Sequence, residues 1–322
     1  MNPLLVSPDS TEYKIFWRDW ENPYNGYPEC PNSSFTDFTV WHVAQHIKYG
    51  NLTSVYVDSM GAVNCYNPRH GCGYRDEKGE VCLTYPVRGM RNYLKRLYSL
   101  LHADGRDHRR NLLWAHTSAR NCLAFSAFLD FQCAGEEVEY VMMTEPNYLR
   151  VYPLEQFQIL FNKSTGTVPM MATVLGRCGP KEWRYVHQYN DQVMQLSLLH
   201  DTLVWGNICD HDYLSKKYYS VLDAFGYRDE ALEFFRYQTQ KLVLCREPDI
   251  HISVYRLRDK ALAVIGNWQN KPRTVKVEID RKALGLGEQL KFADLCTGKP
   301  VDPAAVPLQG FNFILMEIRQ SK

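Results

Sequence analysis

Residues 54–58 read Ser54-Val55-Tyr56-Val57-Asp58, a short apolar run that ends in a carboxylate. Strands of a parallel sheet are buried on both faces, so they appear in a sequence as nearly continuous hydrophobic runs. Barrel enzymes place their chemistry at the C-terminal ends of such strands. The run therefore predicts a buried strand, and Asp58 is the first candidate catalytic residue.

Segments of strand character alternate with amphipathic segments as far as about residue 225. The predicted strands are 13–17, 54–58, 111–116, 127–131, 167–171 and 202–205. The predicted helices are 35–48, 86–102, 153–161, 186–200 and 212–225. Strands that alternate with helices of this length are typical of a parallel sheet. We therefore predict an α/β domain over residues 1–240.

The pattern changes near Lys241 to short alternating strands separated by turn residues such as Thr297-Gly298-Lys299-Pro300. The predicted strands are 251–256, 261–268, 274–279, 290–294 and 311–318. This spacing is typical of an antiparallel β-sandwich. We therefore predict a domain boundary near residue 240 and a small β-sandwich over residues 241–322.

The composition limits the partners of the chain. Its 322 residues include 37 basic and 36 acidic side chains, a net charge of +1, with no long run of one sign. This balance gives no electrostatic footprint for nucleic acid or for an anionic membrane. No stretch has the ~18 to 20 apolar residues of a membrane helix, and the first ten residues do not resemble a signal peptide. We expect neither nucleic acid nor membrane as a partner, and no export signal in this chain.

The ten cysteines include no Cys-x-x-Cys pair, so they match neither a disulfide framework nor a zinc ribbon. Cys65, His70, Cys72 and Cys82 are metal-ligand types, but their spacing fits no familiar site and favours a structured loop. The sequence also lacks a Gly-x-Ser-x-Gly elbow, a Walker loop and a His-Glu-x-x-His motif. We predict no metal and no cofactor.

A series of short motifs resembles the barrel of uncharacterised bacterial proteins related to family 123 glycoside hydrolases. The motifs are Cys65-x-Asn67-Pro68-x-His70-Gly71-Cys72-Gly73-Tyr74, Tyr85-Pro86, Lys95-Arg96-Leu97-Tyr98, His116-x-Ser118, Asp130 and Gly135-Glu136. Two later stretches, Leu199-His200-Asp201 and 254–268, resemble the end of that barrel and the β-sandwich after it. The resemblance covers most of the chain and implies an enzyme that cleaves glycosidic bonds of a carbohydrate.

The resemblance implies a (β/α)₈-type TIM barrel, which needs eight strands. Six strands are readable before the sandwich, so Trp205 would end strand eight, Asp130 strand six and Asp58 strand four. The first two strands would then be missing. We expect a chain that is the C-terminal part of a longer protein, with a missing N-terminal segment of the same protein as its natural complement.

Glycoside cleavage requires two carboxyl groups across the scissile bond. Asp58 is the predicted nucleophile or charge stabiliser, and either Glu136 or Asp130 is the predicted proton donor. A wall of Trp114, Phe128 or Phe131 would raise the pKa of the donor and keep it protonated. A strand-terminal Asp can also serve only as a cap or loop anchor.

Several further side chains are candidates for binding the sugar. His116 could bind a hydroxyl or a carboxylate, or could be a core histidine. The aromatic candidates for stacking on a sugar ring also suit a core; they are Trp17, Trp114 and Trp205, and the resembling motif adds Tyr74 and His70. The alternative function is a catalytically silent carbohydrate-binding or structural remnant, because missing strands would remove sugar subsites.

Overall fold

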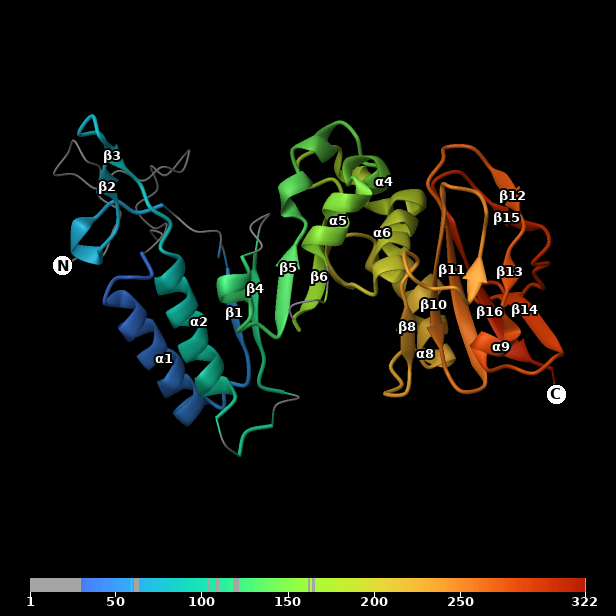
Figure 1. Cartoon of the computed structure of the whole chain (residues 1–322), viewed down its shortest axis with the longest axis horizontal. Helices are drawn as coiled ribbons and strands as arrows, with labels where there is room; N and C mark the ends of the chain where they lie inside the picture. Colours follow the sequence, from blue (N-terminus) through green and yellow to red (C-terminus); the bar gives the residue numbers. More distant parts are fainter. Residues whose placement is uncertain are drawn as a thin grey trace. The chain divides into compact units, whose positions relative to one another are not determined.

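The computed structural model describes residues 30–58, 60, 64–103, 105–107, 110–117, 122–161, 163 and 166–321 (Figure 1). The chain divides into two compact units. Unit 1 comprises Met1–Ala134 and Lys163–Val168, and unit 2 comprises Gly135–Asn162 and Pro169–Lys322. The boundary predicted near residue 240 falls inside unit 2. None of the helices in the described ranges has the length and hydropathy needed to span a membrane.

Unit 1 contains three parallel strands, β1 (Val55–Val57), β4 (Leu113–His116) and β5 (Phe131–Ala134). β4 pairs with both of the others, with Tyr56 opposite Trp114 and His116 opposite Cys133. Three helices accompany them, α1 (Phe35–Gly50), α2 (Val87–Leu101) and the short α3 (Leu123–Ser126). A loop between β1 and α2 holds the 3₁₀ turn η1 (Pro68–His70) and a hairpin of β2 (Tyr74–Arg75) and β3 (Val81–Cys82).

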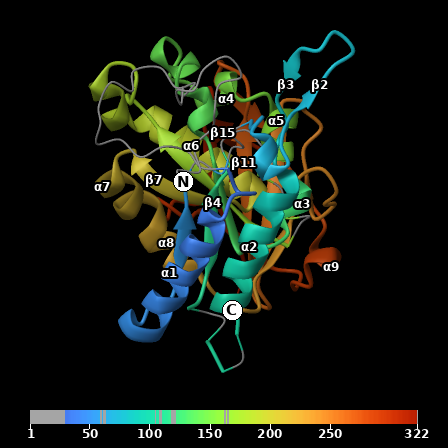
Figure 2. The ribbon, with the colours of Figure 1, turned by 90° about the vertical axis from the view of Figure 1, so that its left-hand side faces the viewer.

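The core of unit 1 lies between α2 and one face of these strands. Leu94, Leu97 and Leu101 recur at helical spacing and are fully buried. They belong to one cluster with Leu113 and Ala115 of β4, and α1 lies along α2 (Figure 2). Because side chains alternate across a strand, Trp114 and His116 lie on the face opposite the helices. The predicted helices 35–48 and 86–102 are confirmed.

The strand predicted over residues 127–131 is wrong. Residues 123–126 form α3, and the strand begins only at Phe131. The backbone N–H of Asp130 donates to the Leu113 carbonyl (2.8 Å), and Leu113 is the first residue of β4. Asp130 therefore precedes β5 and does not end a strand. The predicted strand 13–17 lies outside the described residues.

Unit 2 contains a second parallel pair, β6 (Val168–Val174), of which the first residue belongs to unit 1, and β7 (Leu203–Ile208). β7 is longer than predicted, so Trp205 lies in mid-strand opposite Ala172 and not at a strand end. The helices of this part are α4 (Tyr148–Val151), α5 (Leu154–Leu160), α6 (His187–His200), α7 (His211–Leu214) and α8 (Ser220–Phe225), with a π-helical stretch η5 (Ser215–Tyr219) between the last two. Short 3₁₀ turns are η2 (Glu136–Val138), η3 (Val141–Met143) and η4 (Lys181–Tyr185).

The C-terminal part of unit 2 is antiparallel, as its sequence pattern predicts. One sheet has the order β14-β16-β11-β10-β8, with β14 (Leu290–Asp294), β16 (Phe313–Gln320), β11 (Lys260–Asn267), β10 (Ile250–Arg256) and β8 (Glu233–Phe235). Two small sheets pair β12 (Arg273–Val275) with β15 (Val306–Leu308) and β13 (Glu278–Ile279) with β9 (Val243–Leu244), and α9 spans Arg281–Leu284.

The two faces of β10 make different contacts within unit 2, and the boundary near residue 240 stays a prediction. Ile252 and Val254 point into an apolar core that includes residues of β9, β12 and β15. The intervening Ser253 and Tyr255 donate hydrogen bonds to the carbonyls of Leu199 (2.7 Å) and Leu198 (2.8 Å), near the end of α6. Since α6 packs on the sheet through buried hydrogen bonds, the helical and antiparallel parts form one compact body.

The buried His200 at the end of α6 makes the stability of unit 2 depend on pH. Burial lowers its pKa to about 4 from an ordinary value of 6.5, and its Nδ1 lies 2.8 Å from the Leu196 carbonyl. The folded state therefore binds fewer protons than the unfolded state between these two values. The stability from neutral His200 is complete above pH 6.5 and is lost as the pH falls towards 4, a loss of about 3 kcal/mol.

We expect His200→Gln to flatten this dependence. The measurement is the free energy of unfolding in guanidinium at pH steps from 7 to 4. The wild-type value should fall by about 3 kcal/mol more than that of the variant over this range. His251, whose pKa is also lowered by burial, is present in both proteins and cancels in the comparison. Parallel pH profiles for the two proteins would contradict the assignment.

Candidate functional site

Asp58 and His116 meet at the C-terminal ends of two neighbouring parallel strands. Asp58 directly follows β1 and His116 is the last residue of β4. The Nδ1 atom of His116 lies 3.2 Å from Oδ1 of Asp58. The imidazole is buried, with 5% of its side chain exposed, whereas 66% of the Asp58 side chain is exposed. A buried imidazole thus holds a carboxylate that faces solvent.

Two aromatic residues lie on the same face of these strands. The Tyr56 hydroxyl donates to Oδ1 of Asp58 (3.2 Å), and its ring lies 4.5 Å from the Trp114 ring, tilted by 47°. The backbone N–H of Met60 donates to the His116 carbonyl (3.1 Å), which ties the chain after β1 to the end of β4. Tyr56 was not among the predicted site residues, although its position two residues before Asp58 places both side chains on one face of a strand.

Asp130 lies at the other end of β4. Its Oδ2 accepts the Leu113 N–H (2.7 Å) and lies 3.0 Å from Nε2 of His102, which follows the last residue of α2. Asp130 contacts Leu113, the first residue of β4, and Asp58 contacts His116, the last, and these two residues are about 10 Å apart along the strand at roughly 3.3 Å per residue. The structure therefore does not bring Asp130 together with Asp58. Asp130 anchors the start of a strand to the end of a helix.

Glu136 belongs to unit 2 and is ion-paired. Its carboxylate contacts the guanidinium of Arg177, which also contacts Glu139 through Nε (3.3 Å). The preceding Gly135 has φ of +129°, and a Cβ there would lie 2.4 Å from the Ala172 carbonyl oxygen, so the turn into Glu136 requires glycine. In this arrangement the Glu136 carboxylate accepts a hydrogen bond from Arg177.

The remaining sugar-binding candidates are dispersed. Trp114 lies beside Tyr56 on the Asp58 face, whereas Trp205 is in the middle of β7 in unit 2. Tyr74 is exposed on the β2-β3 hairpin. His70 belongs to a separate cysteine cluster, and Trp17 lies outside the described residues. Of the candidates described in unit 1, only Trp114 shares a face with Asp58 and His116.

The cysteine cluster differs from the group considered in the sequence. Cys30, Cys65 and Cys72 are buried together, and His70 lies against Cys65 with its Nδ1 3.6 Å from the sulfur. Cys82 is instead in β3, where it pairs in register with Tyr74. Sequence analysis missed Cys30 because it lies 35 residues before Cys65, and only the preceding and following prolines mark it as part of an ordered turn.

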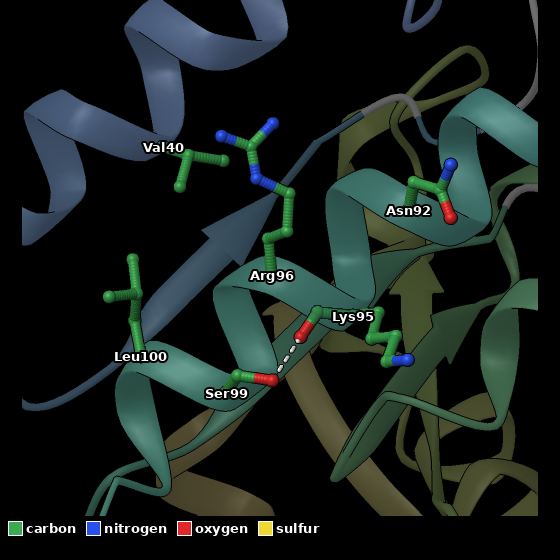
Figure 3. A pocket seen from close by; sticks show the side chains of 6 residues that line it. All are labelled: Val40, Asn92, Lys95, Arg96, Ser99 and Leu100. Atoms are coloured by element: carbon green, nitrogen blue, oxygen red, sulfur yellow. Dashed lines mark hydrogen bonds between the residues drawn. The ribbon is translucent and has the colours of Figure 1, made fainter.

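Two grooves lie away from these residues. One, of about 550 Å³, lies between α1 and α2 in unit 1 and is shown in Figure 3. It is lined by Val40, Asn92, Lys95, Arg96, Ser99 and Leu100. The other, of about 430 Å³, lies in unit 2 beside β7 and α8. Neither is lined by a predicted catalytic or sugar-binding residue, so neither supplies the converging polar groups of an active site.

Solved structures of glycoside hydrolases share the fold of this chain. A maltogenic α-amylase, AmyB, from Thermotoga neapolitana matches 92% of this chain and 68% of its own length at 9% identity and a TM-score of 0.53. An α-amylase from Anoxybacillus matches 92% of this chain and 66% of its own length at 9% identity and a TM-score of 0.52. A GH27 β-L-arabinopyranosidase from Geobacillus stearothermophilus matches 93% of this chain and 65% of its own length at 12% identity and a TM-score of 0.52. The chain thus spans about two thirds of the length of these enzymes.

These likenesses concern the fold alone, because the sequence identities are very low. They do not single out family 123, so that relationship stays a prediction. No protein-family model matches the chain. No curated protein matches it significantly either.

The contacts of Asp130 predict a structural role for its side chain. We expect Asp130→Ala to lower the free energy of unfolding of unit 1 by about 1 to 3 kcal/mol, because the Leu113 N–H loses its charged acceptor. Asp37→Ala is the matched control, since Asp37 forms an exposed pair with Arg96 that should contribute less than about 1 kcal/mol. Denaturant unfolding measures both. Equal losses in the two variants would show that Asp130 is not an anchor.

Proposed function

We propose that the chain is a glycoside hydrolase-type protein that acts on the glycosidic bonds of a carbohydrate through a (β/α)₈-type barrel. The observation that carries the proposal is the exposed Asp58 carboxylate, held by the buried His116 at adjacent strand ends. In such barrels the helices cover the outer face, and the chemistry takes place at the C-terminal ends of the strands. Asp58 and His116 occupy these ends, on the face opposite α2.

The contacts of Asp58 suit a nucleophilic or charge-stabilising carboxylate. Tyr56 and His116 both approach Oδ1 and hold the side chain in one orientation before substrate binds. A fixed carboxylate loses little conformational freedom on reaching the transition state. Trp114 adds an aromatic surface beside Tyr56, suited to contact with the C–H face of a sugar ring.

We assign the proton donor to Glu136 in preference to Asp130. Asp130 accepts the N–H of Leu113 at the N-terminal end of β4, opposite the end where Asp58 lies. Glu136 comes two residues after the last residue of β5 in the sequence. To act as an acid, Glu136 must exchange Arg177 for the leaving-group oxygen. The guanidinium then keeps Glu139 as its partner, so the exchange leaves no unpaired cation.

One observation favours the second candidate function, a catalytically silent carbohydrate-binding protein. Both predicted proton donors are engaged in the structure, Glu136 with Arg177 and Asp130 with His102. Carboxylates committed to ion pairs contribute to structure and do not transfer protons unless a substrate displaces their partners. Asp58 and Trp114 would then serve to bind sugar without cleaving it.

Hydrolysis of a panel of aryl glycosides tests the proposal. We expect Asp58→Asn to reduce kcat/KM by at least about 10³-fold, because the reacting charge is lost while the shape is kept. Asp37→Asn, at an exposed site on α1, should keep full activity. Full activity in Asp58→Asn would overturn the assignment of the carboxylate.

Glu136→Gln and Asp130→Asn distinguish the two donors. Loss of the donor should slow substrates with poor leaving groups strongly and those with activated phenols little, because the latter need no protonation. We expect this split for Glu136→Gln only. If the wild-type protein cleaves nothing but retains a glycan, and both Asp58→Asn and Trp114→Ala abolish that retention, the silent function is the correct one.

A further inference from the structure

We propose that Cys30, Cys65, His70 and Cys72 bind a Zn²⁺ ion that fixes the segment just before α1 to the loop between β1 and α2. Three thiolates and one imidazole form one of the usual ligand sets of structural zinc. All four residues lie in unit 1, and the site is separate from Asp58 and His116.

Two of the distances between donor atoms match a tetrahedral metal, whereas the Cys72 sulfur, which lies beside that of Cys30, is outside the group of three ligand atoms that are close to one another and must shift to complete the site. With zinc–sulfur bonds of about 2.3 Å and zinc–nitrogen bonds of about 2.0 to 2.1 Å, the ligand atoms of a tetrahedron are about 3.8 Å (S to S) and about 3.6 Å (S to N) apart. The Cys30 and Cys72 sulfurs are 3.7 Å apart, and the Cys65 sulfur is 3.6 Å from Nδ1 of His70. The ligand atoms of Cys30, Cys65 and His70 all lie within 4.8 Å of one another.

The site is closed, as structural zinc sites are. Cys30 and Cys65 are fully buried and Cys72 is 3% exposed, and the three form a cluster of their own. Hydrogen-bond donors point at the sulfurs. The Asn67 backbone N–H donates to the Cys65 sulfur (3.4 Å) and the Asn32 side chain donates to that of Cys72 (3.3 Å). Such outer contacts orient and stabilise thiolate ligands.

Local structure directs the ligands of the loop inwards. Asn67 caps η1 by accepting the Arg69 N–H (3.0 Å), and Gly71, at φ of +67°, reverses the chain so that both His70 and Cys72 face Cys65. Nδ1 of His70 faces the Cys65 sulfur, and its Nε2 lies 3.3 Å from the Asn67 side-chain nitrogen. Zinc at Nδ1 would move the imidazole proton to Nε2, so the Asn67 amide would have to turn away or present its oxygen there.

Helix α2 and the bridge to Thr84 position the two ends of the site. The backbone of Cys65 exchanges two hydrogen bonds with that of Thr84, each 2.9 Å. On the other side, a Cβ at Gly89 of α2 would lie 2.8 Å from the carbonyl carbon of Pro31, so glycine allows the segment after Cys30 to approach the helix. Four ligands from two distant segments therefore meet at a place that backbone contacts fix independently.

A disulfide explains the cluster less well. A bond between Cys30 and Cys72 requires sulfurs about 2.05 Å apart, which is far shorter than the observed 3.7 Å. It would also leave the buried thiol of Cys65 facing His70 with no role. Zinc accounts for all four side chains.

The test is the metal content of the full chain, purified without chelator and measured by plasma mass spectrometry. We expect one zinc per chain in the wild-type protein and in Cys82→Ser, and a loss of at least about tenfold in Cys65→Ser, because the thiolate is an essential ligand. His70→Ala should also lose zinc, and His70→Cys should regain it through a four-cysteine site. Cys82→Ser is the matched control, because Cys82 lies outside the cluster.

A measurement on the wild-type chain keeps the test valid if the cysteine variants do not fold. Zinc exchanged for Co²⁺ should give the sulfur-to-metal charge-transfer and visible absorption bands of tetrahedral thiolate coordination. A wild-type chain with no zinc and no such cobalt spectrum would overturn the proposal. An intact mass lower by 2 Da, mapped to a Cys30–Cys72 disulfide, would do so as well, as would equal zinc loss in Cys82→Ser and Cys65→Ser.

Discussion

The parallel register of β1 and β4 determines what unit 1 can do. Val55 pairs with Leu113 and Val57 with Ala115, and all four side chains face the core built on the leucines of α2. Alternation then sends Tyr56, Asp58, Trp114 and His116 to the opposite face. A shift of one residue in β1 would turn Asp58 towards the helices and bury Tyr56 in the leucine core. The contact between Asp58 and His116 thus depends on the apolar residues behind it.

The strand of Asp58 and the long helices were predictable because their signals are local. Val55 to Val57 is an apolar run that ends at a charge, and α2 carries leucines at helical spacing. The bounds of the strand near Asp130 were not predictable. The mostly apolar residues 127–131 continue without a break into Gln132, Cys133 and Ala134, so the sequence does not mark where the strand begins. Leu129 lies in the irregular stretch between α3 and β5 and is buried in the same apolar cluster as the leucines of α2, so in the sequence it resembles a strand position. Because the strand was predicted a few residues too early, Asp130 was expected at its C-terminal end, whereas it directly precedes β5.

The cysteine cluster shows a different limit of the sequence. A local turn sets the spacing of Cys65, His70 and Cys72, so these residues could be grouped from the sequence. The third sulfur, that of Cys30, belongs to a distant segment that packs on Gly89. No spacing rule relates Cys30 to Cys65, because their approach is a matter of tertiary packing. Conversely, Cys82 is close to Cys72 in sequence, and the pairing of β3 with β2 holds it opposite Tyr74.

The two sites of unit 1 are linked through the chain. The loop that begins after Asp58 reaches Cys65 within seven residues, and Cys65 is bonded through its backbone to Thr84, just before α2. Ordering a loop costs roughly 1 to 2 kcal/mol per residue in backbone entropy, so a fixed point early in the loop shortens the part that must be ordered around Asp58. Met60 adds a second such point through the His116 carbonyl. A metal at the cysteine cluster would therefore fix Cys65, seven residues after Asp58 in the sequence, without contacting the carboxylate, which is how a structural site can support a functional one.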